Sequence, residues 1–113
     1  VLGAPPLPAE FAARFEARFG RAPASPFTAH AYDAAMALLQ AADRAATRGD
    51  DGAVTIANAA MRDALLALSL DGLSGPLRFG PGGDRQGGDA PSLGLAFYEA
   101  KDGAFVPVSA QGR

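Results

Sequence analysis

The sequence lacks several residue types on which protein chemistry often depends. Its 113 residues include no cysteine and no tryptophan, a single histidine, His30, and a single lysine, Lys101. Without cysteine the chain forms no disulfide, carries no thiolate nucleophile and offers no Cys-based zinc site. One histidine can assemble neither a histidine metal cluster nor a Ser/His/Asp triad within this chain. We therefore expect a protein that is not an enzyme, with no catalytic residues, no metal site and no cofactor.

An excess of positive charge and long apolar runs are also missing. The chain has 10 Lys and Arg residues against 12 Asp and Glu residues, which gives a net charge of -2. Since nucleic-acid affinity requires positive charge gathered on one face, we expect no nucleic-acid partner. No apolar run approaches the about 18 residues of a membrane span, and Val1–Pro6 does not resemble a signal peptide. We expect a chain that begins after processing or within a longer protein.

Alanine and glycine dominate what is present. Hydrophobic residues make up 49% of the chain, but 27 of them are alanine, beside 14 glycines and 9 prolines. Because alanine buries far less area than leucine or phenylalanine, we expect a modest core carried by the phenylalanines and leucines of a single domain.

The first predicted helix spans about 8–19. Pro8 suits the first turn of a helix, and Gly20 suits a left-handed C-cap. Phenylalanines recur every four residues along it, at Phe11, Phe15 and Phe19. This spacing places three rings on one helix face, which we interpret as a core stripe.

Two further helices are predicted by apolar spacing. One runs from Thr28 until Gly49, and the other from near Thr55 to just before Asp71. In the longer helix one stripe contains Ala31, Ala35, Leu38, Leu39 and Ala42. In the shorter one the inward positions are Ile56, Ala60, Met61, Ala64, Leu65 and Leu68.

After Gly72 the apolar period changes from that of a helix to that of a strand. A short strand is predicted at Gly75–Phe79, a loop at Gly80–Pro91, and a β-hairpin from Leu93 to Val108. Three helices followed by these few strands cannot close a balanced sheet. The pattern is that of an α/β protein from which the other strands are absent.

Several short motifs occur in an order and spacing that resemble a known family. They are Phe11, Phe15, Phe19-Gly20 and Pro23; Ala31-Tyr32-Asp33-Ala34, Leu38-Leu39 and Ala42; Arg62-Asp63-Ala64-Leu65; Gly72-Leu73-Ser74-Gly75-Pro76-Leu77-Arg78-Phe79; Gly83-Asp84-Arg85; and Gly103-Ala104-Phe105-Val106-Pro107-Val108. Together they resemble the C-terminal third of the type I periplasmic solute-binding proteins. The most similar branch is that of the leucine/isoleucine/valine-binding proteins, which feed ABC transporters.

This resemblance implies an α/β fold class and a particular place in a larger molecule. Residues 1–113 would be one C-terminal segment of a two-lobed type I periplasmic binding protein, contributing three helices, a short strand and the hairpin to both lobes. Val1–Pro6 would end a crossing strand, and the loop around Gly83-Asp84-Arg85 would lead back to the other lobe. The principal groups that hold the ligand's charged ends would lie upstream of residue 1.

Phe27 is the one ligand-binding residue that the resemblance supplies. It lies five residues before Tyr32, where the family places a bulky residue that lines the pocket for the ligand side chain. The alternative is that Phe27 packs onto the helix that follows it. For Tyr32 and Asp33 we expect structural roles, because an acid suits the positive end of a helix and a tyrosine hydroxyl suits a buried carbonyl.

Other polar residues carry weaker signals. We expect His30 to lie at the surface or to cap a helix. The pairs Asp50-Asp51 and Asp84 with Asp89 lack the spacing of a calcium loop, so they are interpreted as turn residues. The glycines of 80–88 lack the lysine and hydroxyl residue of a phosphate-binding loop.

The resemblance implies a periplasmic protein that binds an amino acid or similar small molecule by hinge closure and passes it to an ABC transporter permease. One alternative is a sensing domain of a receptor or regulator with the same fold. A third is a small self-contained interaction domain. Because its faces would lack partners, we expect this 113-residue chain to pair with a second copy or to exchange its hairpin.

Overall fold

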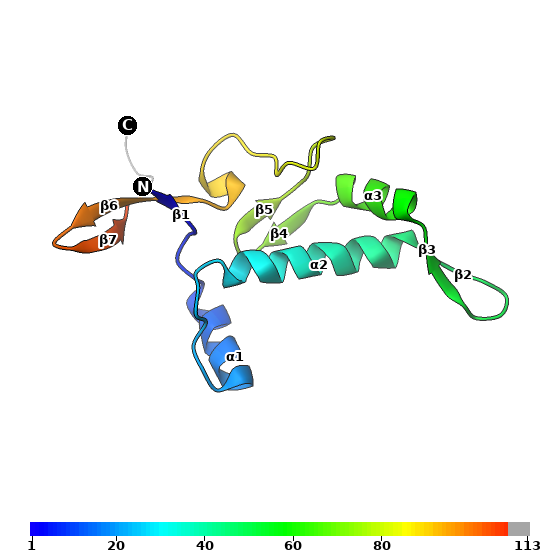
Figure 1. Ribbon diagram of the computed structural model, residues 1–113, viewed down its shortest axis with the longest axis horizontal. Coiled ribbons are helices and arrows are strands. Elements are labelled where there is room, and N and C mark those ends of the chain that lie inside the picture. Colours follow the sequence, from blue (N-terminus) through cyan, green and yellow to red (C-terminus); the bar gives the residue numbers. More distant parts are fainter. Residues whose placement is uncertain (109–113) are drawn as a thin grey trace.

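The computed structural model describes residues 1–108 and shows three helices with seven short strands (Figure 1). The helices are α1 (Ala9–Phe19), α2 (Thr28–Ala45) and α3 (Asn58–Leu66), and one 3₁₀ turn, η1, spans Pro91–Leu93. The strands are β1 (Leu2–Gly3), β2 (Ala46–Arg48), β3 (Val54–Ile56), β4 (Leu70–Gly72), β5 (Gly75–Leu77), β6 (Ala96–Lys101) and β7 (Ala104–Pro107). Within residues 1–108 no helix is both long and apolar enough to cross a bilayer.

The strands form three separate antiparallel sheets. Their orders are β1-β6-β7, β2-β3 and β4-β5. In the first, Leu2 pairs with Phe97, so the start of the chain lies beside a strand almost a hundred residues later. The β6–β7 hairpin turns at Asp102 and Gly103, which have φ of 51° and 79°. This hairpin and β2–β3 lie at opposite ends of the molecule, and α1 projects from one side (Figure 1).

The first predicted helix and the final hairpin are confirmed. Helix α1 begins after Pro8 and ends at Gly20, whose φ of 68° is left-handed and whose N–H donates to the Glu16 carbonyl. Glycine adopts this conformation without the steric cost that a side chain would bring. The hairpin is shorter than predicted, because Leu93 belongs to η1 and the strand begins at Ala96.

The predicted ends of the second and third helices are wrong. Helix α2 ends at Ala45, and the next residues form β2, which pairs with β3 through the contact of Thr47 with Thr55. β-Branched residues favour strands, and Gly52, with φ of 80°, permits the tight connection. The third helix therefore begins only at Asn58, and it ends at Leu66, several residues before the predicted end, so that the chain leads into β4.

The buried hydrophobic residues are alanines and leucines, so leucine contributes to the core as predicted, whereas no phenylalanine among residues 1–108 is buried. One cluster contains Ala37, Leu68 and Leu77, with Leu65, Leu70 and Phe79 partly buried against it. The buried face of α2 is Ala29, Asp33, Ala37, Ala41 and Ala45. The stripe predicted for this helix is turned outward instead: Leu38 and Leu39 are 52% and 65% exposed. The phenylalanine stripe of α1 contains no buried residue.

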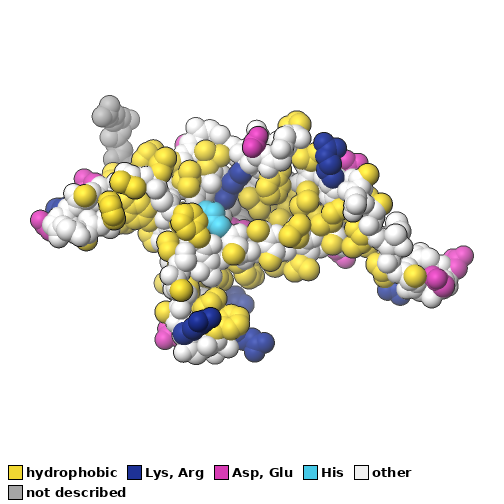
Figure 2. Space-filling model, viewed as in Figure 1, with side chains coloured by type: hydrophobic (Ala, Val, Ile, Leu, Met, Phe, Trp, Pro, Cys, Tyr) yellow, Lys and Arg dark blue, Asp and Glu magenta, His cyan; other side chains and the backbone are white. Residues whose placement is uncertain are grey.

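The chain is more extended than its length requires. Its radius of gyration is 17.6 Å, whereas a compact domain of this size has about 13 Å. Its accessible surface is 8056 Å², against roughly 5,800 Å² for a compact monomer of the same mass. Figure 2 shows apolar side chains spread over much of the visible face. Large apolar surfaces of α1, α2 and the hairpin are therefore uncovered.

The alanine face of α2 predicts a stability difference between two substitutions on one helix. Ala41 has no exposed surface where α2 packs on α3, whereas Ala35 is exposed. Ala41→Leu should lower the free energy of unfolding by about 1–3 kcal/mol, because the added atoms have no space. Ala35→Leu should change it by less than about 0.5 kcal/mol. Urea unfolding of both variants measures this; equal effects would contradict the assigned buried face.

Candidate functional site

Phe27 lies immediately before α2 with its side chain 53% exposed. Its N–H donates to the Ser25 hydroxyl at 3.2 Å, which fixes the entry into the helix. The ring centroid lies 5.3 Å from that of His30, one turn into α2. Phe27 thus contacts the helix that follows it and keeps half of its surface free. Its role in a ligand pocket stays a prediction.

His30 is half-buried and makes a tertiary contact, so the expectation of a surface or capping histidine is wrong. Its Nε2 lies 2.7 Å from the carbonyl oxygen of Gly94, 64 positions along the chain. Its Nδ1 is buried without a hydrogen-bond partner among residues 1–108. His30 therefore connects the first turns of α2 to the segment that leads into β6.

The neighbouring segments β1 and β6 are held together by side-chain as well as backbone contacts. The Tyr98 hydroxyl donates to the Ala4 carbonyl at 2.6 Å, and Ala4 is 2% exposed. The Tyr98 N–H donates to the Val1 carbonyl at 2.7 Å. His30 is linked to this strand pair through Gly94, which lies two residues before β6 begins.

Asp33 is a buried acid that organises the turn between β4 and β5. Its carboxylate is 2% exposed and accepts hydrogen bonds from the N–H of Leu73 and of Ser74, each at 2.8 Å, and from the Ser74 hydroxyl at 2.6 Å. A Cβ at Gly72 would collide with this carboxylate, which explains the glycine there. The expected structural role of Asp33 is thus observed, although its partners lie 40 positions away rather than on its own helix.

The ring of Tyr32 packs on α1, which agrees with the structural role expected for this residue. Its centroid lies 5.5 Å from that of Phe11 in an edge-to-face arrangement. The tyrosine hydroxyl that does reach a buried carbonyl is that of Tyr98. Tyr32 therefore joins α2 to α1 by aromatic packing.

Arg85 extends this network toward β6. Its guanidinium donates to the carbonyls of Ser74, Pro76 and Ser92 at 3.2, 2.8 and 3.2 Å, and to the Ser74 hydroxyl at 3.0 Å. Partial burial lowers the pKa of Arg85, and the charge of Asp33 opposes this shift. Since an arginine remains charged at any ordinary pH, Arg85 acts as a permanent cross-link of the loop 78–94.

Asp89 holds η1 just before β6. The Ser92 N–H donates to the Asp89 carboxylate at 2.9 Å, and the Asp89 N–H donates to the Ser92 hydroxyl at 3.1 Å. Hydrogen bonding by the side chain and backbone of Ser92 lowers the pKa of the Asp89 carboxyl group. Because the pKa of Asp89 is lower in the folded state than in the unfolded chain, its contact with Ser92 stabilises the fold at pH values above the ordinary aspartate pKa. This stabilisation is lost as the pH falls through the pKa of the folded state. The contact is fully formed at neutral pH.

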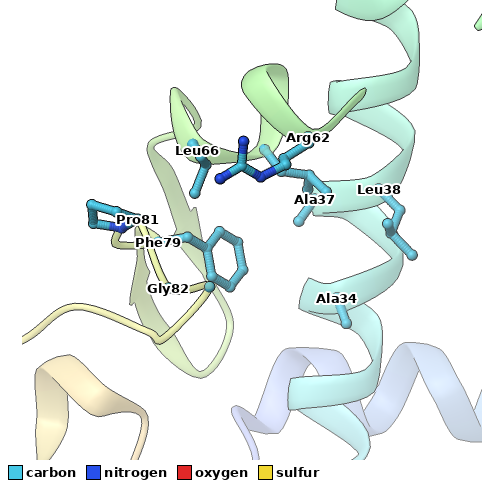
Figure 3. Close-up of a pocket in the computed structure, with 10 residues that line it drawn as sticks. Ala34, Ala37, Leu38, Arg62, Leu66, Phe79, Pro81 and Gly82 are labelled. Carbon is cyan, nitrogen blue, oxygen red and sulfur yellow. The ribbon is translucent and has the colours of Figure 1, made fainter. Parts of the chain in front are cut away.

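Two apolar grooves flank α2. One, of about 870 Å³, lies between α1 and α2 and includes Phe11, Phe15, Phe19 and Tyr32. The other, of about 450 Å³, lies between α2, α3 and the loop after β5. Figure 3 shows the Phe79 ring between α2 and the loop that carries Pro81, with the Arg62 side chain nearby. Within residues 1–108, no group of three or more His, Asp or Glu residues could hold a metal ion.

The sequence alone did not reveal the links that place this site. The sequence places Arg85 in a loop motif and Gly94 at an alternating strand position, and neither pattern indicates a distant partner. Their roles depend on contacts between segments far apart in the chain. The sequence offers one chemical signal. The chain has a single histidine, His30, and Arg85 lies in a glycine-rich stretch, so both side chains have few polar partners nearby in the sequence.

Comparison with known protein families gave a match over most of the chain. A family model described as "Periplasmic binding protein" matches residues 4–104. Neither the curated proteins nor the solved structures gave a significant match. The matched range includes α1, α2, α3 and the whole Asp33, Arg85 and His30 network.

The Asp33 contacts predict that loss of one negative charge destabilises the fold. Asp33→Asn replaces one acceptor oxygen by an NH₂ group that faces N–H donors, so the free energy of unfolding should fall by about 2–3 kcal/mol. Asp43→Asn, an exposed position on the same helix, should change it by less than about 0.5 kcal/mol. Urea unfolding at neutral pH gives both values. A neutral Asp33→Asn would show that the carboxylate does not anchor the turn.

Proposed function

Because the chain belongs to the periplasmic binding protein family, we propose that it forms the C-terminal part of an amino-acid receptor that serves an ABC transporter. Its helices and short strands form a mixed α/β arrangement consistent with a fragment of that fold. The family gives a solute-binding role and an extracytoplasmic location, and its members are generally not enzymes. The amino-acid ligand, the permease partner and a contribution to both lobes are the proposed refinements.

The observation that carries the proposal is the half-exposed ring of Phe27, which is linked through His30 to the segment that leads into β6. Phe27 packs on His30, and His30 bonds to the Gly94 carbonyl two residues before β6. In a two-lobed protein, strands that cross between lobes border the cleft in which the ligand lies. An exposed aromatic ring at that border supplies apolar contact to a ligand.

The proposed ligand is an amino acid with a branched apolar side chain. Phe27 presents an aromatic face with 53% of its surface available, and its ring neighbour is an imidazole rather than a charged group. Such a surface suits an aliphatic side chain and offers nothing to a second charge. The charged ends of the amino acid would be held by residues outside this chain.

Closure around the ligand would occur by bending at the crossing strands. β1 pairs with β6 at only two positions, whereas the loop 78–94 is cross-linked by Arg85 at four acceptors. Hinges are short segments that absorb the rotation of stiffer parts. Of these two parts, the short β1–β6 pairing is the more flexible one. The closed form of the protein would be the one that a permease recognises.

A second candidate function uses the same fold for signalling instead of transport. In a sensing domain of a receptor or regulator, the same closure would report the ligand rather than deliver it. The sequence that surrounds this chain in its gene discriminates the two. A secretion signal with a free C-terminus favours transport, and a following membrane span or kinase favours sensing.

Truncation of Phe27 tests the proposed pocket. In the full-length protein, Phe27→Ala should weaken binding of L-leucine by about 5- to 30-fold, because roughly 1–2 kcal/mol of apolar contact is lost. Phe105→Ala serves as the matched control: Phe105 is 65% exposed in β7, and its removal should leave the affinity unchanged. Isothermal titration calorimetry measures both. Unchanged affinity in Phe27→Ala would remove this residue from the pocket.

The uncovered surfaces predict the behaviour of the 113-residue chain produced alone. Its apolar side chains and unpaired strand edges favour association, so we expect a dimer formed by pairing of faces or exchange of the β6–β7 hairpin. Small-angle scattering with light scattering gives mass and shape together. A monodisperse monomer would favour the small self-contained interaction domain instead.

A further inference from the structure

The contact between His30 and Gly94 requires a particular protonation of the imidazole. The Gly94 carbonyl oxygen can only accept a hydrogen bond, so His30 Nε2, 2.7 Å away, must carry the proton. In the neutral ring Nδ1 is then a bare acceptor. This assignment follows from the chemistry of the partner.

Protonation of Nδ1 would create a buried charged donor. Nδ1 is buried and has no partner among residues 1–108, so a second N–H there would face no acceptor. An unpaired charged donor is much more costly to bury than a bare acceptor nitrogen. The neutral ring therefore fits this position, and the imidazolium does not.

The charges around the ring add to this preference. A Cβ on Gly94 would touch Arg85 Nη1 and lie 3.0 Å from His30 Nε2, so guanidinium and imidazole flank the same glycine. Asp33, one turn further along α2, already accepts hydrogen bonds from the β4–β5 turn. Asp89 is engaged at the start of η1. An imidazolium would thus meet the positive charge of Arg85, and the charge of Asp33, which would oppose this repulsion, already acts on Arg85.

We propose that His30 is a proton-sensitive latch between α2 and the segment that leads into β6. The neutral ring holds Gly94 against the helix. Protonation leaves the Nε2–H donor in place but adds an unpaired buried N–H and a charge beside Arg85, so mildly acidic pH favours opening of the contact. Because Phe27 packs on His30, release also loosens the wall of the ligand site, so acid weakens ligand binding. This last consequence rests on the proposed function, whereas the latch itself does not.

Amide hydrogen exchange in the ligand-free, full-length protein tests the latch. The reporter is the Leu95 N–H, which donates to the Ala90 carbonyl next to the latch. After correction for the intrinsic rate, its protection should fall at least about threefold between roughly pH 7 and pH 5.5, where histidines titrate. His30 is the only histidine of this chain, so no other side chain of ordinary pKa in the chain titrates there.

Two variants distinguish the effect of protonating His30 from the effect of losing its hydrogen bond to Gly94. His30→Gln keeps an N–H that can reach Gly94 but does not titrate, so its Leu95 protection should be the same at both pH values. His30→Phe removes the bond and should show low protection at both. The same pH dependence in His30→Gln as in the wild type would overturn the proposal. Constant wild-type protection would overturn it as well.

A measurement on the wild type covers the case in which a variant fails to fold. In an NMR titration, the His30 ring signals and the carbonyl ¹³C signal of Gly94 should change with a common midpoint, because one event moves both. A Gly94 signal that stays fixed while the ring titrates would contradict the latch.

Ligand affinity separates this inference from the proposed function. L-Leucine should bind at least about threefold more weakly at roughly pH 5.5 than at pH 7 in the wild type, and equally at both in His30→Gln. If L-leucine, L-isoleucine and L-valine all fail to bind, the proposed ligand class is wrong, yet the exchange data still decide the latch. If L-leucine binds but Leu95 protection is independent of pH, the latch alone fails.

Discussion

The buried carboxylate of Asp33 is the constraint on which the arrangement of the chain depends. It fixes two backbone N–H groups and one hydroxyl of the β4–β5 turn against α2, and the same hydroxyl receives Arg85. Arg85 then reaches the Ser92 carbonyl in η1. Charge-assisted hydrogen bonds are about twice as strong as neutral ones, so this chain of contacts compensates for a core with few large side chains.

Small residues explain why polar contacts have this importance. The fully or nearly buried positions of α2 other than Asp33 are alanines, and none of the largest side chains is fully buried. Alanine permits close approach of helices but contributes little apolar area. The phenylalanines and leucines that could contribute more lie on the outward faces of α1 and α2. Those faces are suited to packing against other structure, as expected for a fragment of a larger α/β fold.

The sequence predicted features that depend on local chemistry. Pro8 and Gly20 delimit α1, and the turn at Asp102 and Gly103 marks the hairpin, because backbone preferences of single residues decide these points. It failed where three-residue strands replaced helix ends, since apolar spacing could not distinguish Val54–Ile56 from a first helical turn. It also chose the wrong face of α2, because the wider apolar stripe is turned away from the chain's own core.

The same distinction between local features and long-range contacts applies to the candidate site. Phe27 was predicted by resemblance to a family, whereas the partners of His30 and Arg85 could not be, because Gly94 and Ser74 meet them only in the folded chain. These long-range contacts tie α2, the β4–β5 turn and η1 into one unit. Strand β1 is attached to β6, which follows η1, by two paired positions and by the Tyr98 hydroxyl contact. A rotation between stiff parts concentrates where contacts are fewest, so the short β1–β6 pairing is the element of this arrangement that bends most easily.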